Sequence, residues 1–117
     1  MAQWQALGPE DMLSEGAMQR IDLDATAILL CKVRGVYYAT QEHCPHLRVH
    51  LANGKLNGQV VTCPGHGSQF DVTTGACVAW VEGLPGIVRQ AALAVAKPRD
   101  LTTYPTRLQD GQVWVLA

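Results

Sequence analysis

The sequence predicts an all-β fold, an antiparallel β-sandwich or a small barrel, because short apolar runs alternate with turn signals along most of the chain. Asp110-Gly111 separates Thr106–Leu108 from Gln112–Leu116 and is a strong signal for a two-residue hairpin turn. The chain has 117 residues, of which 48% are hydrophobic. This length suits one domain with a modest core, and we expect a single domain over residues 1–117.

The first part of the chain contains three runs that we expect to form strands: Ala17–Leu23, Ala27–Arg34 and Val36–Thr40. In the second run, Leu29, Cys31 and Val33 share one face at a period of two. Gly35 then interrupts the pattern, so the second and third runs are expected to pair as a hairpin.

Residues 42–67 have a different character. They contain all four histidines, two cysteines and two prolines, and little apolar periodicity except in Gln59–Thr62. This composition is typical of loops that are held by something other than a core. Beyond them, Gln69–Val72 and Ala76–Trp80 are expected strands that are joined by a turn at Thr74-Gly75.

One later segment has helical spacing, carried by Leu84, Ile87, Val88, Ala91, Ala92 and Val95. Pro85 suits the first turn of a helix and Pro98 lies just past its end. We therefore expect a short helix over Gly86–Ala96. The alternative is a strand in which Leu93 and Val95 share a face.

Composition limits the function. Charged residues make up 16% and the net charge is −1, so we expect no nucleic-acid partner. No apolar run approaches the roughly 18 residues of a membrane span, and the N-terminus lacks the pattern of a signal peptide. We expect a cytoplasmic protein whose four cysteines are ligands or buried thiols.

The residues that carry chemistry are Cys44-Pro45-His46 and Cys63-Pro64-Gly65-His66, which are separated by sixteen residues. Each motif offers one thiolate and one imidazole. Both ligand types suit iron in a sulfide-bridged cluster, and a Rieske centre needs two of each. Zinc is the alternative metal, although common zinc modules place a cysteine pair before a histidine pair.

The stretches Cys44–Leu47 and Cys63–Asp71 resemble the two cluster-binding loops of Rieske [2Fe–2S] proteins. The order of hairpins is similar to that of soluble Rieske ferredoxins of bacterial ring-hydroxylating dioxygenase systems. The resemblance implies one [2Fe–2S] cluster per chain, with one iron on the two motif cysteines and the other iron on His46 and His66. It also implies a sandwich of two antiparallel sheets, with a small cluster-binding subdomain of about residues 42–82 inserted between strands.

The function that this resemblance implies is electron transport, without catalysis by the chain itself. The partners would be an NAD(P)H-dependent flavoprotein reductase and a terminal oxygenase. Two alternatives stay open, a Rieske small subunit of a larger oxidoreductase such as nitrite reductase, and a zinc-stabilised interaction module. Compared with similar ferredoxins, Val81–Lys97 looks like an insertion that either covers a sheet edge or docks a partner.

The remaining two histidines and two cysteines are not expected to bind the cluster. His43 and His50 flank the first motif and are expected at the surface or close to the cluster. Cys31 is expected to be a buried thiol and Cys77 a free one, and a disulfide between these two stays open.

The residues around the motifs predict a reduction potential in the lower part of the Rieske range, which spans roughly −150 to +300 mV. Respiratory Rieske proteins join their two loops by a disulfide, whose positions here are Val49 and Gly65. They also donate hydrogen bonds to the cluster from a serine and a tyrosine. Ser68 supplies a matching hydroxyl, but Phe70 stands in the tyrosine's place and has none. Protein-film voltammetry measures the potential, and a midpoint above about +200 mV would contradict this prediction.

Overall fold

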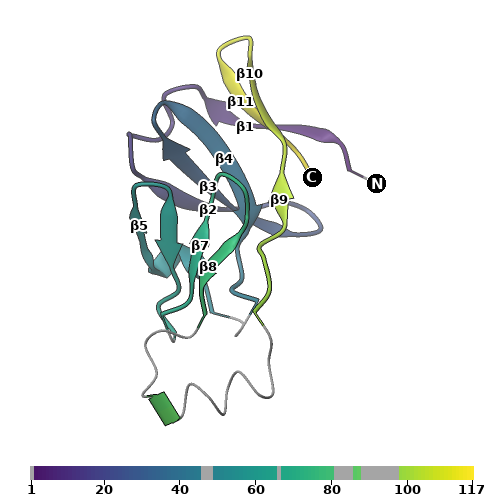
Figure 1. The fold of residues 1–117 in the computed structure, drawn as a ribbon. Helices are drawn as coiled ribbons and strands as arrows, with labels where there is room; N and C mark the ends of the chain where they lie inside the picture. The colour runs from purple at the N-terminus through teal and green to yellow at the C-terminus, as the bar shows by residue number, and fades with distance from the viewer. Residues whose placement is uncertain (1, 46–48, 66, 81–85, 88–97) are drawn as a thin grey trace.

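The computed structural model describes residues 2–45, 49–65, 67–80, 86–87 and 98–117, and these residues contain three antiparallel sheets (Figure 1). The first sheet has the order β1-β11-β10 and consists of β1 (Trp4–Pro9), β11 (Gln112–Leu116) and β10 (Thr106–Gln109). The second has the order β2-β3-β4-β9 and consists of β2 (Met18–Asp22), β3 (Ala27–Val33), β4 (Val36–Gln41) and β9 (Thr103–Tyr104). The third consists of β5 (Lys55–Asn57), β6 (Val60–Thr62), β7 (Gln69–Asp71) and β8 (Cys77–Ala79), preceded by a short 3-10 helix, η1 (Leu51–Asn53).

The all-β antiparallel class and the expected hairpins are confirmed. The backbone of two turns explains why Gly35 and Gly111 correctly predicted hairpins. Arg34 and Gly35 have φ values of 50° and 78°, and Asp110 and Gly111 have φ values of 54° and 74°. Two consecutive residues with positive φ match the right-handed twist of the strands that they join, and glycine adopts this conformation without steric cost.

Three strands of the structure were not expected from the sequence: β1, β5 and β9. β1 pairs with β11 from the opposite end of the chain, and its register shifts between Ala6 and Gly8. β5 and β9 have only three and two residues. Such strands form because a partner strand offers hydrogen bonds, so their own sequence carries no periodic signal.

β3 is buried on both faces. Leu29, Cys31 and Val33 share a face as expected, and Ile28 and Leu30 on the opposite face are equally buried. The strand therefore contributes to two separate hydrophobic cores. We call the first the cysteine core, consisting of Leu29, Cys31, Val33, Cys44, Leu51, Val61, Cys63, Phe70, Val72, Trp80 and Leu101. We call the second the sandwich core, consisting of Leu13, Ile28, Leu30, Tyr37, Ala39, Val113 and Val115.

The two cores define how the sheets pack. The sandwich core joins β11 of the first sheet to β3 and β4, and the cysteine core joins the other face of β3 to β6 and β7 of the third sheet. The second sheet thus lies between the other two (Figure 1). Strands β5 to β8 lie within the subdomain expected at about residues 42–82, whose limits stay a prediction.

The helix expected over Gly86–Ala96 lies almost wholly outside the described residues. Only Gly86 and Ile87 are described, and their backbone is helical. The helix and its strand alternative therefore both stay predictions, as do the two roles suggested for Val81–Lys97. Within the described ranges, no helix has the length and apolar character that a membrane crossing requires.

The two cores predict two matched losses of stability. Leu29→Ala opens a cavity in the cysteine core and Leu30→Ala opens one in the sandwich core, because both side chains are fully buried. Each variant is expected to lose about 2–5 kcal/mol of unfolding free energy in urea titrations. Leu108→Ala is the control, since this side chain is 54% exposed and should change stability by less than about 0.5 kcal/mol. Equal stabilities of the three variants would contradict the two-core architecture.

Candidate metal centre

Both motif cysteines are buried in the cysteine core. Cys44 lies between β4 and η1 and is 3% exposed, and Cys63 follows β6 directly and is 1% exposed. Phe70 and Trp80 belong to the same core and pack edge to face, with ring centroids 6.4 Å apart. The structure therefore brings the two predicted sulfur ligands into one core. His46 and His66 lie outside the described residues.

The two motif loops are closed by equivalent hydrogen bonds. The amide N–H of Cys44 donates to the carbonyl oxygen of Val49 over 2.9 Å, and the amide N–H of Cys63 donates to that of Ser68 over 2.8 Å. In both loops the acceptor is five residues after the cysteine. The spacings C-x-H and C-x-x-H thus place each histidine inside a loop of the same span, with a buried cysteine at its base.

The second loop also provides a hydrogen bond to sulfur. The amide N–H of Gly65 donates to Sγ of Cys63 over 3.4 Å. A donor at this position stabilises a thiolate, which is the form that binds metal. The described residues contain no disulfide between cysteines. This donor set of buried sulfurs with an N–H bond fits an iron–sulfur cluster.

Ser68 and Phe70 are both fully buried beside this loop. Phe70 lies on β7 opposite Val61 of β6, so its ring fills the cysteine core. The bond that Ser68 is expected to donate to the cluster stays a prediction.

Cys31 and Cys77 are free thiols, so the disulfide between them that the sequence left open is not formed. Burial raises the pKa of the Cys31 thiol to about 12. Burial also raises the pKa of Cys77, and the nearby charge of Asp100 acts in the same direction. Both shifts favour the protonated thiol over the thiolate.

Sequence reasoning missed one group at the base of the first loop, the carboxylate of Glu42. It is completely buried, and Oε1 lies 2.5 Å from Nδ1 of His50 while Oε2 accepts a bond from the amide N–H of Ala52 over 3.3 Å. No pattern in the sequence marks it, because Glu42 lies just after β4 and burial along that strand does not alternate strictly.

Arg20 of β2 completes this group, and it too was missed. Its Nη1 lies 3.7 Å from Oε1 of Glu42 and 3.1 Å from Nδ1 of His50. His43 is exposed, and its ring centroid is 5.3 Å from that of His50. Both histidines reach the surface as expected, since His43 is exposed and the side chain of His50 is 42% exposed beside Glu42.

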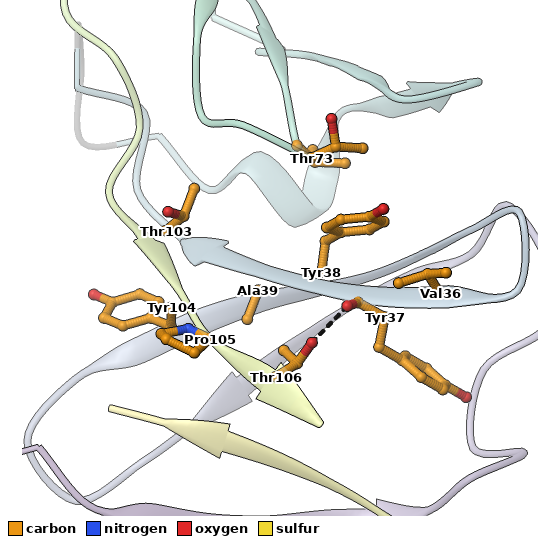
Figure 2. Close-up of a pocket in the computed structure, with 10 residues that line it drawn as sticks. Val36, Tyr37, Tyr38, Ala39, Thr73, Thr103, Tyr104, Pro105 and Thr106 are labelled. Atoms are coloured by element: carbon orange, nitrogen blue, oxygen red, sulfur yellow. Dashed lines mark hydrogen bonds between the residues drawn. The ribbon is translucent and has the colours of Figure 1, made fainter. Parts of the chain in front are cut away.

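A pocket of about 490 Å³ lies elsewhere, against β4 (Figure 2). None of the motif residues lines it. The hydroxyl of Thr106 donates to the carbonyl oxygen of Tyr37 over 2.6 Å in its wall, which ties β10 to β4. This pocket is therefore separate from the candidate centre.

A protein-family model described as the Rieske [2Fe-2S] domain matches residues 3–105. The ferredoxin component of the naphthalene 1,2-dioxygenase/salicylate 5-hydroxylase systems of a Ralstonia species is 29% identical over 103 residues, which cover 88% of this chain and 85% of the relative. The corresponding naphthalene 1,2-dioxygenase component of Pseudomonas putida is 27% identical over 111 residues, covering 95% and 91%.

Solved structures show the same fold. A ferredoxin of Sphingomonas yanoikuyae B1 has a TM-score of 0.79 at 23% identity, covering 98% of this chain and 99% of that one. A chain in a complex of reduced oxygenase and oxidised ferredoxin in carbazole 1,9a-dioxygenase has a TM-score of 0.77 at 24% identity, covering 97% and 92%.

The close approach of η1 to the second loop predicts that Gly54→Ala reduces metal loading. A Cβ at this position would lie 2.0 Å from the carbonyl oxygen of Thr62, the residue before Cys63. The end of β6 would have to move, and Cys63 would move with it. Gly86→Ala is the control, because no atom of the described residues lies within 4 Å of its added Cβ. Iron per chain after purification is the measurement, and wild-type loading in Gly54→Ala would refute the prediction.

Proposed function

The chain belongs to the Rieske [2Fe-2S] domain family, and on that premise we propose that it carries single electrons from an NAD(P)H-dependent flavoprotein reductase to a terminal oxygenase. The observation that carries the proposal is the pair of equivalently closed loops, each with a buried cysteine at its base. The chain itself is proposed to have no catalytic site, in line with relatives that are ferredoxin components of dioxygenase systems.

Membership of the family implies one [2Fe–2S] cluster, which when bound accepts and releases one electron. We assign one iron to Cys44 and Cys63 and the other to His46 and His66, so that each loop gives one ligand to each iron. Neutral imidazoles in place of two thiolates remove negative charge from the centre. This raises its potential above the roughly −400 mV of all-cysteine plant-type clusters.

The surrounding residues perform two tasks in this proposal. Leu51, Val61 and Phe70 are fully buried and exclude water from the side of the sulfur ligands. In the second loop, Pro64 and Gly65 directly after the buried Cys63 are exposed. Their exposure next to position 66 supports the histidine side as the place where electrons enter and leave.

The choice of oxygenase as acceptor is supported by a similar chain found in a complex of oxygenase and ferredoxin. The reductase as electron donor and the cytoplasm as location were expected from the sequence analysis, and both are part of the proposal. The domain division, a single domain over 1–117 with a cluster-binding subdomain at about 42–82, belongs to it as well.

The ligand assignment predicts that Cys63→Ala loses the cluster whereas Cys77→Ala keeps it. Both changes remove a thiol, but only the first removes a ligand, since Cys77 is a free thiol on β8. Wild type and Cys77→Ala are expected to contain about two iron and two acid-labile sulfide per chain. Their reduced-state EPR spectrum should show an average g value below that of all-cysteine clusters.

Stopped-flow reduction by a flavoprotein reductase and reoxidation by a terminal oxygenase test the carrier function. A colourless wild-type protein that folds and holds zinc would overturn the proposal in favour of a zinc-stabilised module. Stable co-purification with a large oxidoreductase subunit would overturn it in favour of a small-subunit role.

A further inference from the structure

We propose that Arg20, Glu42 and His50 form an ion group that holds the first ligand loop in place and sets the potential of the centre. This inference rests on the proposed function, because it concerns the centre that the two loops would hold. None of the three residues belongs to the ligand motifs.

Glu42 acts as a positioning residue because its backbone and side chain join three segments. Its carbonyl oxygen accepts a bond from the amide N–H of Leu51 over 2.9 Å, so the two arms of the loop are paired at their base. Its carboxylate adds the bonds to His50 and to Ala52 at the start of η1. Cys44 follows two residues later, so a shift of Glu42 would move it directly.

The buried carboxylate of Glu42 needs a positively charged partner and hydrogen-bond donors. A carboxylate with no solvent exposure is stable only when it is paired and hydrogen-bonded. Arg20 provides the opposite charge from β2, and its side chain is 39% exposed. Arg20 also pairs over 2.9 Å with Asp22, whose side chain is 71% exposed, so the positive group is held from both sides.

A second metal ion is the rival occupant of this place. Donor atoms of Glu42, His43 and His50 lie within 4.8 Å of one another. However, Nη1 of Arg20 lies within 3.4 Å of both ring nitrogens of His50, where an added cation would meet its charge. The geometry therefore gives the role of the cation to Arg20.

The test compares the midpoint potentials of Glu42→Gln and Arg20→Gln with that of the wild-type holoprotein. Loss of the negative charge favours the reduced state and should shift the potential upward, whereas loss of the positive charge should shift it downward. Each shift should correspond to a several-fold change in the equilibrium constant and exceed the shift of the control, because a unit charge acts on the centre through partly solvated protein. Arg20→Lys keeps the charge and should restore the wild-type potential.

Asp110→Asn is the matched control for Glu42→Gln. It removes the same charge in the β10–β11 turn at the far end of the molecule and should leave the potential unchanged (Figure 1). A merely structural role would give shifts of one sign or none, and that result would overturn the proposal. If Glu42→Gln does not bind the cluster, the potential of Arg20→Gln becomes the test. An unshifted potential in Arg20→Gln would also overturn the proposal.

Two further measurements separate this inference from the proposed function. Iron and sulfide analysis of the wild type tests the function, and an iron-free wild type would end both ideas. An iron-loaded wild type whose variants do not shift in opposite directions ends only the inference. Zinc or another divalent ion bound beyond the two irons, and lost in His50→Gln, would assign the place to a metal and overturn the role of Arg20.

Discussion

The candidate centre depends on one repeated interaction, the hydrogen bond from the amide of each motif cysteine to the carbonyl five residues later. These two bonds give both loops the same span and fix the cysteine at the base of each. The rest of the structure keeps the two bases in place. Cys44 follows β4 and Cys63 follows β6, and both side chains lie in the cysteine core, which packs β3 of the second sheet against β6 and β7 of the third.

Polar groups hold the base of each ligand loop in place, but the interactions differ between the two loops. The second loop offers a backbone donor to sulfur, from Gly65 to Cys63. The first loop depends on the buried carboxylate of Glu42, which Arg20 compensates from β2. Beyond the backbone bond that closes each loop, the second loop thus has an N–H donor to sulfur and the first has a buried ion pair. Substitutions at the two bases will therefore affect the centre in different ways.

Sequence reasoning succeeded where the signal was local. The hairpin at Asp110-Gly111 and the ligand motifs are encoded in consecutive residues, and glycine at positive φ leaves few alternatives. β1 was missed because its structure is determined by β11, more than a hundred residues later. Glu42 was missed for a related reason. A single acidic residue beside a loop is ordinarily exposed, and the burial of Glu42 is tolerated because Arg20 pairs with its carboxylate and His50 and Ala52 hydrogen-bond it.

The double burial of β3 has a consequence for how this chain can change over time. Ile28 and Leu30 lie in the sandwich core, while Leu29 and Cys31 lie in the cysteine core. Substitutions in β1, β10 and β11 can therefore accumulate and be compensated among themselves without crossing the central sheet. Relatives can therefore differ at many positions of the sandwich core and still keep the same ligand geometry. Substitutions on that side of the second sheet do not change the packing of the cysteine core.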